Sequence, residues 1–194
     1  MCVARGTCML IRAAASLPVL FFGLLLPISP SADQNDPGLD ALFERIAVTD
    51  DPEEATVIQS KIWRIWVRAE QAEIDRLMEK GIEALATNEL ERAIDLFTEI
   101  VEKSPNFAEG WNKRATAYYL NGDFNASVRD IERTLALEPR HFGAVSGMGL
   151  IFLSQGDNVG ALQAFTRVLE INPHAEGARE QVRRLNQALQ GQGV

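Results

Sequence analysis

The chain has little of what most catalytic and metal sites need. Only two histidines and two cysteines occur among its 194 residues. Metal sites and nucleophile triads require several convergent groups of these kinds. We therefore expect a protein that is not an enzyme, with no catalytic residue, no metal site and no cofactor.

Basic residues are also scarce. Lys and Arg total 19 against 27 Asp and Glu, which gives a formal net charge of −8. An acidic protein is poorly suited to bind nucleic acid or anionic membranes in general. The apolar fraction of 46% is normal for a globular chain and argues against global disorder.

The segment 1–32 differs in composition from the rest of the chain. Arg5 and Arg12 are its only charges, and an apolar run spans 13–28. Small residues follow, and cleavage after Ser31 fits better than cleavage after Ala32. This order predicts a secretory signal peptide over 1–32 and a location in the bacterial periplasm. The alternative, an uncleaved membrane anchor, is disfavoured because a spanning helix needs roughly 18 to 20 residues, more than this run provides.

Cleavage would remove both cysteines, Cys2 and Cys8, so the mature chain could form no disulfide. It would also remove two arginines, and the mature net charge would be 17 − 27 = −10. We expect no stable membrane insertion after cleavage.

A regular repeat governs the middle of the chain. Pro105, Pro139 and Pro173 recur at equal spacing, and further columns of similar residues share the same period. These columns are Gly81, Ala115 and Gly149; Ala93, Ser127 and Ala161; Phe97, Ile131 and Phe165; Leu77, Trp111 and Val145; and Asn88, Gly122 and Gly156.

Each unit is predicted to be two helices. In the second unit apolar spacing predicts helices over 108–120 and 124–137, with a turn at Gly122. Pro139 ends the unit because it cannot donate the next helical hydrogen bond. Small residues in both helices, such as Ala115 and Ser127, would let the two backbones approach closely.

The pattern resembles the tetratricopeptide repeat, through Trp111, Ala115, Tyr118, Ser127 and Pro139. The resemblance implies an all-α, right-handed helical-hairpin solenoid. Its three units would span 74–107, 108–141 and 142–175. The chain departs from the usual pattern at Ala84, Lys103 and Asn158. Segments 110–115 and 139–144 also look like small exported tetratricopeptide proteins of alphaproteobacteria.

Both ends of the stack are expected to be covered. Start signals at Asp36-Pro37 and Asp51-Pro52 predict an N-terminal helical hairpin within 33–73, as a degenerate repeat or cap. Residues 176–194 are predicted to be a capping helix and tail. Trp63 and Trp66 are interpreted as core of the hairpin rather than as anchors for a partner. His141 and His174 are interpreted as turn residues that could satisfy the last carbonyls of a helix.

The resemblance also implies a binding surface, because tetratricopeptide stacks usually bind peptides along their concave face. The predicted peptide-binding residues are Met78, Ile82, Asn112, Lys113, Thr116, Tyr119, Ser146, Leu150 and Leu153. A charged clamp for a peptide C-terminus is not expected, because Lys113 is the only cation at the matching positions. We expect a neutral, partly apolar groove with Tyr119 as its central anchor and Tyr118 in the core. The alternative is that the apolar residues Met78, Ile82, Leu150 and Leu153 pack against the N-terminal hairpin or the last helix.

The resulting hypothesis is a non-enzymatic protein-interaction module or scaffold of the periplasm, with a protein or peptide partner and no nucleic acid. The alternative is a structural subunit of a self-associating or fixed envelope complex.

Overall fold

A computed structural model describes residues 33–191 of the chain, and the predicted leader and the last three residues lie outside that range. The described part contains helices and no strand, which confirms the all-α prediction. In chain order the helices are α1 (Gly38–Val48), α2 (Pro52–Trp66), α3 (Ala72–Ala86), α4 (Leu90–Lys103), α5 (Ala108–Leu120), α6 (Phe124–Leu137), α7 (Phe142–Ser154), α8 (Asn158–Ile171) and α9 (Glu176–Gly191).

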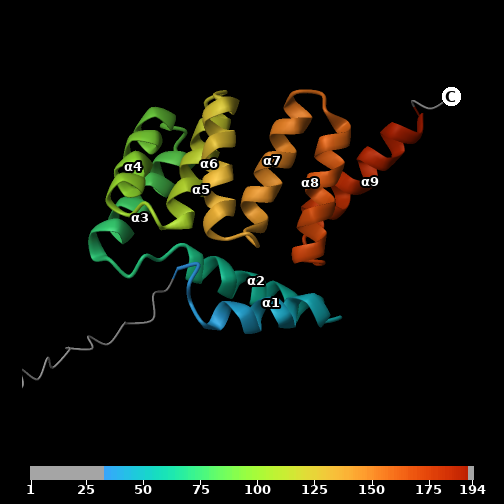
Figure 1. The fold of residues 1–194 in the computed structure, drawn as a ribbon, viewed down its shortest axis with the longest axis horizontal. Coiled ribbons are helices and arrows are strands. Elements are labelled where there is room, and N and C mark those ends of the chain that lie inside the picture. Colours follow the sequence, from blue (N-terminus) through green and yellow to red (C-terminus); the bar gives the residue numbers. More distant parts are fainter. Residues whose placement is uncertain (1–32, 192–194) are drawn as a thin grey trace, which may run out of the picture.

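Helices α3 to α8 form three successive antiparallel hairpins (Figure 1). The bounds of α5 and α6 are those that the apolar spacing predicts. Asn88, Gly122 and Gly156 all adopt positive φ in the tight turns within the hairpins, where glycine and asparagine are tolerated best. The next helix is then capped in two hairpins, because Asp123 and Asp157 each accept a hydrogen bond from a backbone N–H of its first turn.

Small residues set the spacing within the hairpins. A Cβ on Gly81 would lie 2.4 Å from the ring of Phe97, and one on Gly149 would lie 2.9 Å from the ring of Phe165. Each aromatic ring therefore fills the space that a larger residue on the first helix would occupy.

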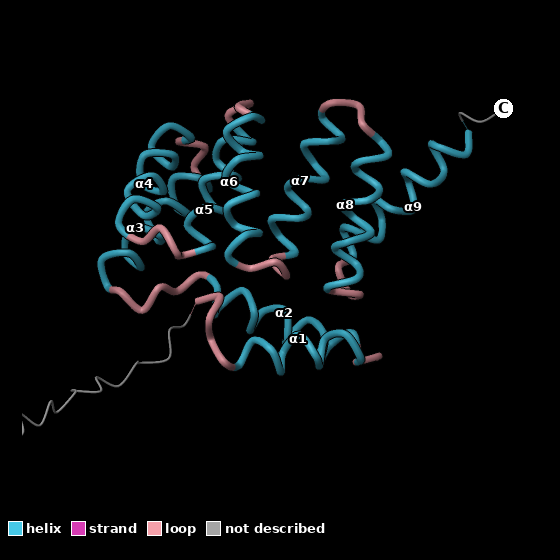
Figure 2. The backbone as a smooth tube through the Cα atoms, in the orientation of Figure 1, coloured by secondary structure: helices cyan, strands magenta, loops and turns pink. Residues whose placement is uncertain are grey.

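The N-terminal hairpin α1–α2 lies across one edge of the stack rather than at the end of the row (Figure 1). Figure 2 shows the turns between hairpins facing it. Polar contacts of residues 34–59 reach the α4–α5, α6–α7 and α8–α9 turns: Gln34 with Asn106 and Ala108, Asp40 with Arg140, Thr49 with His174, and Gln59 with Asn172.

This placement corrects the expectation of a repeat-like hairpin stacked on the first unit. Phe43, Ile62 and Trp66 of the hairpin share one apolar core with Phe142 and Phe165 of the third unit. Helical periodicity shows which face of α1 and α2 is apolar, but it does not show which partner covers that face. The short link to α3, in which Glu70 has a φ of +53°, turns the chain back along the stack.

Helix α9 packs against α8 and covers the C-terminal end of the row. Ala178 and Leu185 are buried in the core that the hairpin and α8 share, and the opposite face carries Arg179, Arg183 and Arg184. Within residues 33–191, no helix has the length and apolarity needed to cross a bilayer.

Candidate functional site

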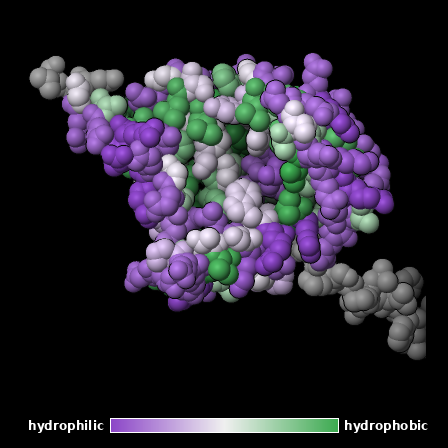
Figure 3. Space-filling view, turned by 180° about the vertical axis from the view of Figure 1, so that it is seen from behind, coloured by the Kyte–Doolittle hydropathy of each residue, from purple (hydrophilic) through white to green (hydrophobic). Residues whose placement is uncertain are grey.

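The concave face of the stack is hollow. Seen from behind, pale and green side chains gather in the hollow and hydrophilic residues dominate around it (Figure 3). Three cavities follow one another there. We call them the proximal compartment, between α2, α3 and α5, with a volume of about 730 Å³; the central cleft, between α5 and α7, about 140 Å³; and the distal compartment, between α2, α7 and the start of α9, about 550 Å³.

Shared lining residues show that the three cavities adjoin one another along one groove. Trp63 lines both the proximal and the distal compartment. Gly143 and Ser146 line both the distal compartment and the central cleft. A single extended ligand could therefore contact all three.

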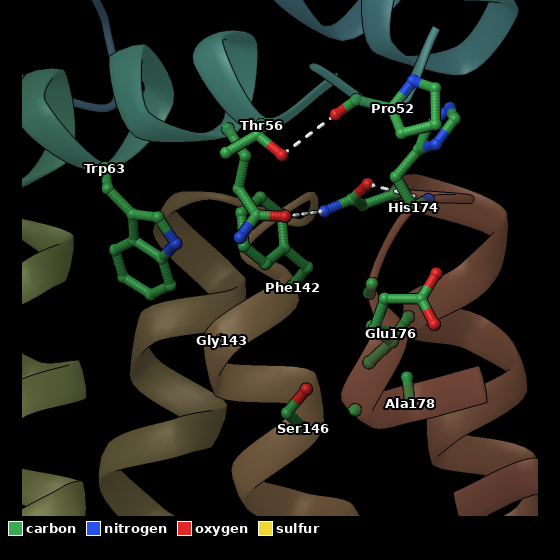
Figure 4. A pocket seen from close by; sticks show the side chains of 14 residues that line it. Pro52, Thr56, Trp63, Phe142, Gly143, Ser146, His174, Glu176 and Ala178 are labelled. Carbon is green, nitrogen blue, oxygen red and sulfur yellow. Dashed lines mark hydrogen bonds between the residues drawn. The ribbon is translucent and has the colours of Figure 1, made fainter. Parts of the chain in front are cut away.

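Helix α2 supplies one wall of this groove. Pro52, Thr56, Gln59 and Trp63 line the distal compartment. Their spacing of four, three and four positions places them on one helical face. Figure 4 shows Trp63 projecting from α2 toward α7, beside Phe142 and Gly143. The sequence analysis did not predict this wall, because it assigned Trp63 to the core. The helical spacing of Pro52, Thr56, Gln59 and Trp63 could have indicated that α2 has a second face that contacts the stack.

The two tryptophans of α2 therefore differ. Trp66 is buried in the core, as predicted, whereas Trp63 is only partly buried and separates the two compartments. Its ring makes edge contacts with Trp66, His141 and Phe142, and the Nζ atom of Lys113 lies 5.5 Å from its centroid.

The position of Trp63 depends on the absence of a side chain at Gly143. A Cβ at this position would lie 2.5 Å from the Trp63 ring, closer than real Cβ contacts come. We expect Gly143→Ala to displace the indole, which should shift the tryptophan emission spectrum and lower the melting temperature. Gly147→Ala is the matched control on the same helix, because its nearest neighbour would be the flexible end of Ile131 at 3.3 Å. Equal, small effects of both substitutions would contradict this close approach.

The structure brings most of the predicted binding residues to the groove. Met78, Ile82 and Lys113 line the proximal compartment, and Asn112, Thr116, Tyr119, Ser146 and Leu150 line the central cleft. Ile82 and Leu150 are both 38% exposed, so their apolar side chains are open to a ligand.

Three of the predicted residues are not open groove residues. Met78 is 2% exposed and packs among the apolar side chains of α3 and α4, rather than against the N-terminal hairpin or the last helix. Asn112 is 6% exposed, and its Nδ2 atom donates to Oε2 of Glu109 at 3.0 Å. Leu153 packs against the core that the hairpin shares with the third unit. For Met78 and Leu153 a neighbouring element covers a helical face that the sequence pattern leaves open, whereas Asn112 is bound to Glu109 of its own helix.

The two tyrosines also differ from expectation. Tyr118 is only half-buried and lies outside the apolar cores of the described residues, under the guanidinium of Arg114 at 5.7 Å. Tyr119 packs its ring on Phe124 with centroids 5.7 Å apart and rests against the core around Ile131. Helices α3, α4, α6 and α7 all contact α5, and both tyrosine side chains are partly buried.

A buried polar cluster lies beneath the groove. Glu109 and His141 have fully buried side chains, and His141 Nε2 lies 2.8 Å from Glu109 Oε2. His141 Nδ1 accepts the backbone N–H of Ala144 at 3.1 Å, so the proton of the neutral ring sits on Nε2 and is donated to Glu109. The ring stacks on Trp66 at 4.1 Å, and Lys113 Nζ lies 3.1 Å from Glu109 Oε1.

The electrostatics of this cluster keep Glu109 ionised. Burial raises the pKa of Glu109, but the charge of Lys113 and the hydrogen bond from His141 outweigh it, so the pKa is lowered overall. His141 thus caps the start of α7 instead of meeting the last carbonyls of α6. His174 differs again, because its Nε2 atom lies 2.9 Å from the carbonyl oxygen of Thr49 in the N-terminal hairpin. Between residues 33 and 191 no group of His, Cys, Asp and Glu side chains is arranged to hold a metal ion.

Comparisons with known proteins agree with this architecture. The tetratricopeptide repeat family model matches residues 78–126 and 112–176. A TPR repeat-containing protein of Rhizobium etli is 37% identical over 153 residues, which cover 79% of this chain and 75% of the relative. The small glutamine-rich tetratricopeptide repeat-containing protein 2 of Saccharomyces cerevisiae is 29% identical over 114 residues, 59% of this chain and 32% of that protein.

Solved structures give the same picture. The first TPR domain of Spaghetti (RPAP3), bound to the HSP90 peptide SRMEEVD, superposes with a TM-score of 0.58 at 26% identity. The match covers 62% of this chain and 95% of that one. MamA protein superposes with a TM-score of 0.55 over 76% of this chain and 78% of that chain, and at 18% identity it supports the fold alone.

Proposed function

Because the chain belongs to the tetratricopeptide repeat family, we propose that its concave groove binds a peptide or helix of a partner protein and that the protein is a non-enzymatic interaction module. The observation that carries this proposal is the adjacency of the three cavities along the groove, which share Trp63, Gly143 and Ser146 as lining residues. Concave surfaces of this size with apolar linings and a few polar groups suit the anchoring side chains of a peptide.

The groove offers the contacts that such a ligand needs. Ile82 and Leu150 present apolar surface to anchor side chains. The hydroxyl groups of Thr116 and Ser146 can exchange hydrogen bonds with an extended backbone. The peptide bound by the RPAP3 domain supports this mode of binding. We do not propose that the groove binds the acidic C-terminus of a peptide. Met78, Ile82, Gly143 and Gly147 stand where a charged clamp would place polar groups.

Selection of random displayed peptides on the full chain tests this proposal. We expect enriched peptides whose binding is abolished by Ile82→Arg and by Leu150→Arg, since each places a charge on an apolar anchor site. Val159→Arg is the matched control, because Val159 is an exposed apolar residue of α8 that lines none of the three cavities. Peptides that bind all three variants like the unmodified chain would place the interaction surface elsewhere.

Tyr119 should contribute to binding through its ring rather than its hydroxyl. The hydroxyl oxygen lies 3.5 Å from Ser154 Oγ, which is long for a hydrogen bond, whereas the ring packs on Phe124. We expect Tyr119→Ala to weaken capture of the selected peptides and to lower stability by about 1–3 kcal/mol, less than for a fully buried aromatic. Tyr119→Phe should change neither property by much. If Tyr119→Phe is as harmful as Tyr119→Ala, the hydroxyl is the important group.

We further propose that the protein works in the bacterial periplasm after removal of its leader. The support is the basic start and apolar run within residues 1–32. Intact-mass measurement of the protein from the periplasmic fraction should show a chain that begins near Ala32 or Asp33. A cytosolic chain that retains Met1 would refute this part of the proposal.

A further inference from the structure

Two arginines of the N-terminal hairpin stand at the edge of the proximal compartment. Arg64 and Arg68 are exposed, lie four positions apart and line this cavity. Neither forms an ion pair with any residue that the structure describes, whereas the arginines of α9 are paired with Glu176 and Glu180. The protein as a whole is acidic, so two unpaired cations at its most voluminous groove cavity run against its overall charge.

The nearby acids are mostly engaged. Asp75 Oδ1 accepts the backbone N–H of Ala69 at 2.8 Å. Glu109 is held by Lys113, Asn112 and His141. Glu79 is thus the only carboxylate of the lining that has no ion pair or hydrogen bond within the described residues. The dipole of α2 accounts for a cation in its last turn, such as Arg64, but Arg68 lies beyond the end of that helix.

Apolar side chains also line the compartment, beside its charged residues. Val67 and Trp63 line it from the hairpin, Ile82 lines it from α3, and Met78 is its buried floor. The volume of about 730 Å³ accommodates a large side chain together with part of the backbone that carries it. Apolar lining beside unpaired guanidinium groups is complementary to an apolar side chain next to a carboxylate.

We propose that the proximal compartment takes an apolar side chain of the partner peptide and that Arg64 and Arg68 bind an Asp or Glu side chain adjacent to it. This inference rests on the proposed function. It assigns the charge preference of the groove to the N-terminal hairpin, outside the repeats. The preference is for an internal acidic side chain rather than for a peptide C-terminus.

Selection of the same random-peptide library on charge-reversed full chains tests this proposal. One variant carries Arg64→Glu and Arg68→Glu. The control carries Arg76→Glu and Lys80→Glu, which lie four positions apart on α3, line none of the cavities, and change the net charge by the same amount. Thermal unfolding of both variants should match the unmodified chain, because all four side chains are exposed.

We expect peptides selected on the unmodified chain to carry Asp or Glu next to a Leu, Ile, Met or aromatic residue. Their affinity should fall about tenfold for the Arg64/Arg68 variant and less than twofold for the Arg76/Lys80 variant, in line with exposed ion pairs. Selection on the Arg64/Arg68 variant should enrich Lys or Arg at that place. The loss should shrink as salt is added.

Three results would overturn the inference. Peptides that depend on Ile82 and Leu150 but show no acidic preference would leave the proposed function standing and refute this assignment. Equal losses in both charge-reversed variants would mean that only the net charge of the protein matters. If dodecanoate displaces the peptides and binds more tightly than they do, the occupant of the proximal compartment is a small amphiphilic carboxylate and not a peptide. A library that yields no groove-dependent peptide at all would instead overturn the proposed function.

Discussion

His141→Ala should lower the free energy of unfolding by about 3–5 kcal/mol, because it removes the shortest hydrogen bond to the buried Glu109 carboxylate. The substitution also removes the cap of α7 and the ring stacked on Trp66 at 4.1 Å. Urea unfolding followed by circular dichroism measures the change. His174→Ala is the matched control: its hydrogen bond to Thr49 is partly exposed, so we expect a cost of about 1 kcal/mol. Similar losses for the two histidines would contradict the special role of the buried cluster.

The same cluster predicts a pH dependence. The pKa of Glu109 in the folded protein is lowered from its ordinary value of 4.5, because the charge of Lys113 and the contacts of His141 outweigh burial. A carboxylate with a lowered pKa stabilises the fold above its unfolded pKa, and that contribution is lost as the pH falls through the folded pKa. Stability should therefore decline below about pH 4.5. In Glu109→Gln the decline should be shallower, and an unchanged slope would argue against this contribution.

Gly149→Leu should destabilise the third hairpin by about 1–3 kcal/mol or more, because a Cβ there already lies 2.9 Å from the Phe165 ring. Thermal unfolding should show the loss directly. Gly177→Leu is the control, since nothing lies within 4 Å of the corresponding position on α9. It should leave the melting temperature nearly unchanged.

A second substitution shows whether the Phe165 ring is the cause. Phe165→Ala alone should be destabilising, because it empties a buried site. Combined with Gly149→Leu, it should cost less than the sum of the two single changes, because the leucine can occupy the vacated space. Strict additivity would mean that the two positions do not meet as described.

The helices were predictable because their signals are local. The regular repeat, the apolar spacing within each unit and the glycine in the turn determine the bounds of α5 and α6. The small residues at Gly81 and Gly149 likewise follow from the repeat, since close helix contacts need them wherever an aromatic ring stands opposite. The same local signals indicated which faces of α1, α2 and α9 are apolar.

The groove depended on contacts between segments that are far apart in the chain. The hairpin could have stacked on the first unit, but its apolar side chains instead share a core with the third unit, so α2 became a wall. That placement exposed one side of Trp63 to the groove and brought Arg64 and Arg68 to its edge.

The sequence also did not predict the burial of Met78, Asn112 and Leu153. Burial depends on what packs against a helical face and not on the periodicity of that face alone. Glu109 lies in the first turn of α5 and His141 caps α7, 32 positions later, and only the packing of α5 beside α7 joins them into one buried pair. The amino-acid sequence by itself determined the helices and the repeat. The tertiary structure decided which helical faces remain open to a partner, because that choice follows from non-local packing rather than from periodicity.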